Sequence, residues 1–218
     1  MLLTQCEAGF GYSFSNVKLK KWYDPEGILE DTNEESDIFG QPLVNQPGEK
    51  WEYGVNIDWA GRLVERASGL SLDEYFQKFI FAPLGMSRTS FFPSTEMKKK
   101  LAYLHQRAPD GHIEVREHGH VLRRPLMAST PEKIKATVNS GGAGIFGTPS
   151  EYCEIIAMLL NHGTHPKTGQ QILKQDTVTG KSRETRLKWI SLAENSLRDV
   201  QEPNPPISRL CKKPDTSK

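Results

Sequence analysis

The sequence has only three cysteines, and they lie far apart. Cys6, Cys153 and Cys211 form no Cys-x-x-Cys pair, and no histidine accompanies them at the spacing of a zinc site. An odd number of dispersed cysteines is typical of a reducing compartment. The sequence therefore predicts a cytoplasmic setting, with Cys153 as a buried free thiol and no metal centre.

Net charge and long apolar runs are missing as well. With 28 lysines and arginines against 27 aspartates and glutamates, the formal net charge is +1. This gives no electrostatic reason to expect a nucleic-acid partner. No apolar run is long enough to span a bilayer, so no membrane partner is predicted. Residues 1–5 (MLLTQ) lack a basic segment followed by a long apolar one, so no signal peptide is expected.

Apolar residues are scarce for an enzyme of this length. They make up 36% of the 218 residues, and the mean hydropathy is −0.56. These values indicate that part of the chain does not contribute to a core. After residue 178 apolar residues become rare, and prolines lead into a lysine-rich end. We therefore predict a folded region over residues 1–178 and a disordered or weakly helical tail over residues 179–218.

Two helices are predicted in succession near the middle of the chain. Over residues 57–68, apolar side chains recur at the spacing i, i+3, i+4 and i+7, and Gly69 supplies a stop. The second helix begins after Ser71, which forms a capping-box pattern with Glu74. Its predicted apolar stripe consists of Leu72, Tyr75, Phe76, Phe79 and Ile80, and Pro83 and Gly85 end it.

A third helix is predicted after the glycine-rich segment at residues 141–147. Thr148 is the expected N-cap, Pro149 the first helical residue and Glu151 the third. The helix should end near residues 161–163, and its predicted apolar face consists of Tyr152, Ile155, Ile156, Leu159 and Leu160.

Short strands and loops are predicted between the second and third helices. Residues 89–92 have the composition of a strand. Asp110-Gly111 is a hairpin-turn pair between residues 103–105 and residues 112–115. The basic and acidic residues around His112, His118 and His120 favour a solvated loop over a metal site.

The most informative stretch is WEYGVNIDWAG, residues 51–61, which follows a Pro-Gly turn and leads into the first predicted helix. It delivers Tyr53 to the start of a helix with tryptophans on both sides. A phenol in that place can move a proton in acyl transfer, or it can be a packing residue. The residue pattern alone leaves both interpretations open.

This stretch resembles the tyrosine motif of the serine β-lactamase, penicillin-binding protein and carboxylesterase superfamily, most closely its esterase and acyltransferase-like members. Further similar segments are PGEKWEYG, IDWAGRLVERASGLSLDEYF, FAPLGM, GGAGIFGTPSEY and MLLNHGTHPKTG. The resemblance implies an α/β (α+β) fold, an antiparallel sheet sandwich with a helical subdomain, of which this chain would hold an incomplete part. It also implies serine-dependent transfer or hydrolysis of small-molecule esters, amides or acyl groups without a cofactor.

The superfamily uses a Ser-x-x-Lys, a tyrosine and a Lys-Thr-Gly triplet in that order. Ser15-x-x-Lys18, Tyr53 and Lys167-Thr168-Gly169 match these patterns. However, Ser15 follows a loop-like segment of glycine and aromatic residues, whereas the family nucleophile opens a buried helix. Residues 2–10 resemble the family segment that lies downstream of the nucleophile. We therefore interpret Ser15 and Lys18 as a coincidental match, and Lys167 as a solvated charge in a surface loop.

Three residues are weaker candidates for binding substrate. Gly141 and Gly142 resemble the glycine-rich stretch that borders the family's active-site cleft, and a phosphate loop is excluded because no Gly-Lys-Ser/Thr follows. Asn56 lies three residues after Tyr53, whereas the family asparagine lies two residues after its tyrosine. Three hypotheses remain. We favour a family member that is truncated at both ends, keeps Tyr53 and is inactive because it lacks the nucleophile, the base and the oxyanion strand. The others are an active esterase that uses Ser15 and Lys18, and a non-catalytic ligand-binding or interaction protein.

Overall fold

The computed structural model describes residues 9–12, 16–23, 38–46, 51–117, 119–120 and 122–179. Ser15 and residues 180–218 of the predicted tail lie outside these ranges. The labelled elements are α1 (Val17–Tyr23), α3 (Asn56–Ser68), α4 (Leu72–Phe76), the π-helical η3 (Gln77–Phe81), α5 (Thr95–Lys99), β1 (His105–Arg107), β2 (Ile113–Val115), α6 (Arg123–Met127), α7 (Pro131–Lys135) and α8 (Pro149–Leu160). None of the described helices has the length and apolar character needed to cross a membrane.

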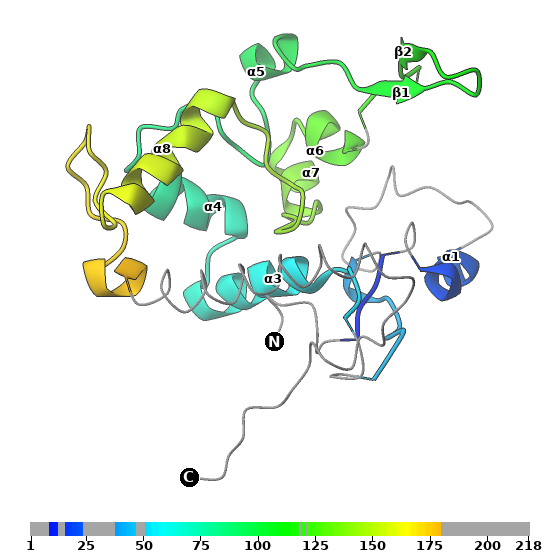
Figure 1. Ribbon diagram of the computed structural model, residues 1–218, viewed down its shortest axis with the longest axis horizontal. Helices are drawn as coiled ribbons and strands as arrows, with labels where there is room; N and C mark the ends of the chain where they lie inside the picture. The colour runs from blue at the N-terminus through cyan, green and yellow to red at the C-terminus, as the bar shows by residue number, and fades with distance from the viewer. Residues whose placement is uncertain are drawn as a thin grey trace, which may run out of the picture.

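Helix α3 confirms the prediction for residues 57–68 and forms the long helix below α4 and α8 in Figure 1. It ends as predicted at Gly69, whose φ of 72° is in the left-handed region that glycine adopts readily. The Gly69 N–H donates a hydrogen bond to the Glu65 carbonyl at 2.9 Å. The amino end of α3 therefore has a fixed position, and the tyrosine motif leads directly into it.

The capping box that starts α4 is present. The Ser71 side chain accepts a hydrogen bond from the Glu74 N–H, and the Glu74 carboxylate accepts one from the Ser71 N–H at 2.8 Å. The helix then widens into the π-helical turn η3, where hydrogen bonds span five residues. This turn shifts the buried face, so Phe81 is 2% exposed and Phe79 is 44% exposed. The predicted stripe, which assumed regular helical spacing, was wrong at Phe79.

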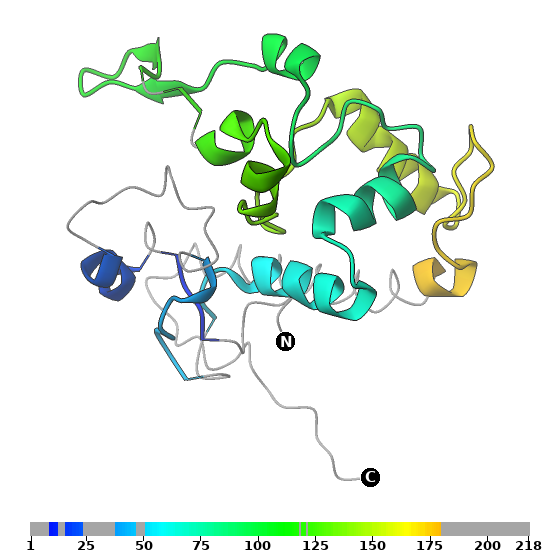
Figure 2. The same cartoon turned by 180° about the vertical axis from the view of Figure 1, so that it is seen from behind.

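The principal core lies between η3 and α8, which Figures 1 and 2 show on one side of the molecule. Phe81 and Met86 are buried there against Met158 of α8. Thr148 caps α8 by accepting a hydrogen bond from the Glu151 N–H, as predicted. The inward side of α8 carries Glu151 and Met158, which are its buried residues.

The predicted apolar face of α8 is right only in part, because Ile155 packs against the principal core. Tyr152 and Leu160 are largely exposed in the described structure, Leu160 to 77%. The prediction that Cys153 is a buried thiol is also wrong, because Cys153 is exposed. It comes two residues after the buried Glu151, and two residues turn a helix by about 200°, which points the side chains in nearly opposite directions.

This orientation of α8 predicts unequal effects for two substitutions at its carboxyl end. Met158→Ala should lower the free energy of unfolding by about 2–4 kcal/mol, because it leaves a cavity in the core. Leu160→Lys should change it by less than about 0.5 kcal/mol, because the side chain is already in solvent. Urea denaturation followed by circular dichroism measures both values. A larger loss for Leu160→Lys would mean that the outer face of α8 is covered.

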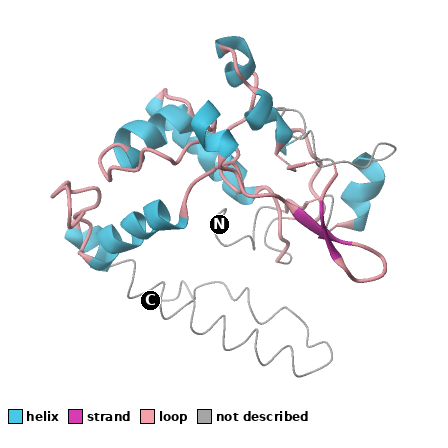
Figure 3. Ribbon diagram, turned by 90° about the horizontal axis from the view of Figure 1, so that it is seen from above, coloured by secondary structure: helices cyan, strands magenta, loops and turns pink. Residues whose placement is uncertain are grey.

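Strands β1 and β2 form an antiparallel hairpin that projects from the helical body in Figure 1 and is the magenta element of Figure 3. Its register pairs His105 with Val115 and Arg107 with Ile113. The predicted Asp110-Gly111 turn is confirmed, and Gly111 has a φ of 93°. The strand predicted at residues 89–92 is reduced to one bridge between Ser90 and Phe146. The short helices α5, α6 and α7 were not predicted.

Candidate functional site

Tyr53 lies immediately before α3, with its side chain 45% exposed. The neighbouring Gly54 allows the chain to approach the segment at residues 9–12 closely, because a Cβ on Gly54 would lie 2.6 Å from backbone atoms of Phe10 and Gly11. This approach sets the Tyr53 ring against the Tyr12 ring, with centroids 4.9 Å apart and planes tilted by 54°. The phenol therefore remains accessible while its ring is supported on one side.

The hydroxyl of Tyr12 is held by a buried carboxylate at the start of α3. It donates a hydrogen bond to Asp58 Oδ2 at 3.2 Å. Asp58 Oδ1 accepts a hydrogen bond from the Ser140 hydroxyl at 2.5 Å and one from the Gly142 N–H at 3.3 Å. Burial, followed by the negative charge of Asp58, raises the pKa of the Tyr12 phenol well above its ordinary value. Tyr12 is therefore a permanent donor rather than a base.

The turn formed by Gly141 and Gly142, which the sequence predicts to border the substrate cleft, lies beside the Asp58 carboxylate. A Cβ on Gly141 would lie 2.6 Å from the carbonyl oxygen of Ile57, so glycine permits the turn to pack against α3. A Cβ on Gly142 would lie 3.0 Å from both Asp58 Oδ2 and the Tyr12 hydroxyl. The structure thus brings Gly141 and Gly142 to the tyrosine cluster. Whether they bind substrate stays a prediction.

Asn56, the third substrate-binding candidate, is completely buried at the first position of α3. Within the described part of the chain, neither its amide oxygen nor its amide nitrogen has a hydrogen-bond partner. Buried amides usually have partners, so this side chain is unusual. It offers no exposed surface to a ligand in this structure, and its role stays a prediction.

Lys18 belongs to the short helix α1 and has an exposed side chain. Its ammonium group donates a hydrogen bond to the Val44 carbonyl at 3.3 Å. The Asn16 side chain accepts hydrogen bonds from the N–H groups of Lys18 and Leu19 and so caps α1. Ser15 lies outside the described residues, so its geometry relative to Lys18 is not defined by the structure.

The Lys-Thr-Gly triplet lies in a surface turn, as predicted from the sequence. Gly169 has a φ of 70°, and the exposed Lys167 forms an ion pair with Glu154 of α8. The buried His165 contacts Glu154 Oε2 and the Thr168 hydroxyl, both at 2.9 Å. The hydrogen bonds from Lys167 and His165 hold the pKa of the Glu154 carboxyl below its ordinary value. This cluster attaches the turn to α8.

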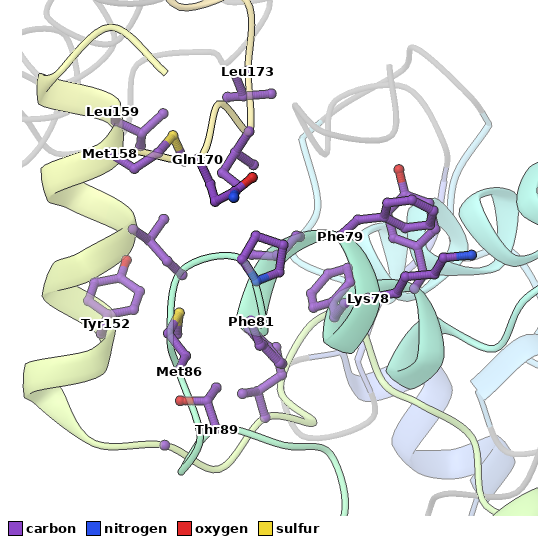
Figure 4. A pocket seen from close by; sticks show the side chains of 18 of the residues that line it. Lys78, Phe79, Phe81, Met86, Thr89, Tyr152, Met158, Leu159, Gln170 and Leu173 are labelled. Atoms are coloured by element: carbon purple, nitrogen blue, oxygen red, sulfur yellow. The ribbon is translucent and has the colours of Figure 1, made fainter. Parts of the chain in front are cut away.

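A pocket of about 1070 Å³ lies between η3 and α8, and Tyr53 is not among the residues that line it. Figure 4 shows Tyr152 and Met158 of α8 on one side, with Phe79 and Phe81 across from them. Its walls are mainly aliphatic and aromatic. The hydrogen bond between the Tyr12 phenol and the Asp58 carboxylate lies outside this pocket. We therefore assign the candidate chemistry to a second cluster, the tyrosine site, which consists of Tyr53, Tyr12, Asp58 and the Gly141–Gly142 turn.

A sequence model of the β-lactamase family matches residues 18–192 of the chain, which include Tyr53, Asp58 and the glycine turn. The chain belongs to the β-lactamase family.

Characterised relatives of this β-lactamase-family chain are esterases and acyltransferases. It is 33% identical over 166 residues to a lovastatin esterase of Penicillium rubens. The matched region covers 73% of this chain and 39% of that protein. It is 32% identical over 162 residues to a monacolin J acid methylbutanoyltransferase of Aspergillus terreus, covering 70% of this chain and 35% of that enzyme. The chain therefore spans less than half the length of these relatives.

Solved structures confirm the predicted fold class of this family member. A simvastatin synthase variant from Aspergillus terreus superposes with a TM-score of 0.59 at 30% identity, covering 82% of this chain and 38% of the synthase. A penicillin-binding protein homologue from Pyrococcus abyssi, at 18% identity, shares the fold with a TM-score of 0.52, covering 82% of this chain and 36% of its own. The fold is thus the β-lactamase and transpeptidase type, present here in part.

Two residues of the tyrosine site were missed by sequence reasoning. Asp58 was placed in a helix without a role, although an acid among Ile57, Trp59 and Ala60 was a signal for a buried carboxylate. Tyr12 belongs to the segment of glycine and aromatic residues before Ser15, and the sequence predicts no role for it. No periodicity could join it to Asp58, because the two are 46 residues apart.

Proposed function

We propose that this chain carries the tyrosine part of an acyl-transfer site for small-molecule esters, amides or acyl donors, and that Tyr53 moves the proton in that reaction. The observation that carries the proposal is the accessible Tyr53 phenol, whose ring lies 4.9 Å from a Tyr12 ring anchored to a buried carboxylate. The esterase and acyltransferase relatives support acyl transfer as the reaction class.

The chemistry requires a proton to leave the attacking hydroxyl and another to reach the leaving group. A tyrosine in its phenolate form beside the reacting atoms can accept the first proton, and the phenol that this produces can supply the second. The Gly141–Gly142 turn would border the substrate, because its backbone lies beside Asp58 and Tyr12. No cofactor is needed for this reaction in our proposal.

We further propose that Ser15 and Lys18 are not the nucleophile and base. The Lys18 ammonium group is exposed and donates to the Val44 carbonyl, whereas a base must hydrogen-bond the hydroxyl that it activates. The 218-residue chain on its own should therefore not turn over p-nitrophenyl butanoate, and a fluorophosphonate probe should leave its intact mass unchanged. An adduct mapped to Ser15, or hydrolysis abolished by Ser15→Ala, would contradict this proposal.

The role of Tyr53 is tested by ligand binding, which does not require a nucleophile. Lovastatin, the ester named in one relative, should bind the chain saturably in isothermal titration calorimetry. Tyr53→Phe should weaken binding about fivefold, because it removes one hydrogen-bonding group worth about 1 kcal/mol. Tyr103→Phe is the matched control, since Tyr103 is 79% exposed beside the hairpin. Equal affinities for the wild type and the Tyr53→Phe variant would contradict the proposal.

A further inference from the structure

Asp58 joins three parts of the chain that are distant in sequence. Its carboxylate lies in the first turn of α3 and is 2% exposed. The hydrogen bonds that it accepts come from Tyr12, 46 residues earlier, and from Ser140 and Gly142, 82 and 84 residues later. A single side chain therefore fixes the aromatic segment and the glycine turn relative to the helix that follows Tyr53.

Burying this carboxylate is costly unless its oxygens are satisfied. Its recorded partners are two hydroxyls and a backbone N–H, and none of the described ion pairs includes Asp58. Its position in the first turn of α3 adds a favourable interaction with the helix dipole. An apolar side chain could fill the same space with less desolvation, but it could not orient a phenol and a turn. The arrangement therefore indicates that Asp58 orients the Tyr12 phenol and the glycine turn and does not merely fill space in the core.

The Tyr12 hydroxyl is the point where Asp58 reaches the tyrosine site. A hydrogen bond at the hydroxyl fixes where the far end of the Tyr12 ring lies, so it fixes the place of that ring beside Tyr53. Tyr53 itself is nearly half exposed, and contacts with neighbouring side chains decide where an exposed ring points. Without the bond to Asp58, the Tyr12 ring would lose its orientation and the Tyr53 ring would lose a fixed support.

We propose that Asp58 is a positioning residue for Tyr53, acting through the Tyr12 hydroxyl and through the Gly141–Gly142 turn. This inference rests on the proposed function, in which the Tyr53 phenol moves the proton. Asp58 does not touch the reacting atoms. It sets the direction of the Tyr53 phenol and the distance between that phenol and the Gly141–Gly142 turn.

Nuclear magnetic resonance on the full chain with ring-labelled tyrosine tests the inference without any turnover. The six tyrosines are few enough to assign by single Tyr→Phe substitutions. The wild type should show ring-to-ring Overhauser effects between Tyr12 and Tyr53. Asp58→Ala should abolish them, because it leaves the Tyr12 hydroxyl without this acceptor, and should weaken lovastatin binding about fivefold.

Two further variants separate positioning from stability. Tyr12→Phe keeps the ring and removes only the oxygen that binds Asp58, so it tests the same contact even if Asp58→Ala does not fold. Residues 12 and 53 should lose their fixed contact in this variant. Ser140→Ala removes a different donor to Asp58 and should lower the melting temperature while preserving the Tyr12–Tyr53 contact. A ring contact that persists unchanged in Tyr12→Phe would overturn the inference.

The ligand result is interpreted separately from the ring contact. If the wild type shows the ring contact and Tyr12→Phe loses it, but the wild type binds no lovastatin, the proposed function fails while the positioning of Tyr53 by Asp58 stands. If lovastatin binds the wild type and the Tyr12→Phe variant equally well, the proposed function stands and the positioning role of Asp58 fails.

Discussion

Replacing Glu151 by alanine should destabilise the fold by about 2–5 kcal/mol, because it leaves the buried Thr89 hydroxyl and the partly buried Arg88 N–H without an acceptor. Both carboxylate oxygens of Glu151 accept the Arg88 N–H at 3.0 Å, and Oε2 also accepts the Thr89 hydroxyl at 2.6 Å. These bonds attach the amino end of α8 to the segment that follows η3. Their loss should loosen the two sides of the principal core at once.

Chemical denaturation of the full chain measures this loss, and Glu96→Ala is the matched control. Glu96 lies in the short helix α5, and both it and its ion-pair partner Lys99 are exposed. The control variant should lose much less stability, because water replaces most of the hydrogen bonding and charge interaction of an exposed ion pair. A Glu151→Ala variant as stable as the control would show that the Arg88–Thr89 segment does not depend on this carboxylate.

Gly54→Ala should have the second large effect, a loss of about 1–3 kcal/mol together with loss of the Tyr12–Tyr53 contact. The added methyl group would lie 2.6 Å from three backbone atoms of Phe10 and Gly11, which cannot move without shifting the whole segment. That segment continues into Tyr12. Thermal melting measures the stability, and the ring Overhauser effects report whether the tyrosines have separated.

Gly61→Ala provides the comparison for Gly54→Ala. In α3 the new methyl group would meet mainly the end of the Leu72 side chain, at 2.9 Å. Alanine also favours a helix over glycine by about 1 kcal/mol, so the net change should be small. If both variants lost similar stability, close approach of residues 9–12 to Gly54 would not be a structural requirement.

The sequence predicted the helices best where capping residues and apolar spacing agreed. Gly69, the Ser71–Glu74 capping box and the Thr148 cap all lie where local chemistry placed them. These interactions join residues within one helical turn, so neighbouring residues in the sequence are sufficient to specify them. The tyrosine motif was found for the same reason, because Tyr53 is adjacent in sequence to the helix that it precedes.

The errors arose where a contact joins distant residues. The wide turn of η3 moved Phe81 into the core and Phe79 toward solvent, and the packing of α8 exposed Tyr152 and Cys153. Helical spacing states which side chains share a face, but not which face meets the rest of the protein. That choice depends on the surfaces available elsewhere in the fold.

The sequence by itself therefore determined the family, the starts of the three predicted helices and Tyr53 as the candidate phenol. Only the tertiary structure decided which groups surround that phenol. Asp58 meets Tyr12 across 46 residues and Ser140 across 82 residues, separations that no local pattern encodes. The physical reason is that a buried carboxylate takes its donors from whichever backbone segments the fold brings within about 3 Å.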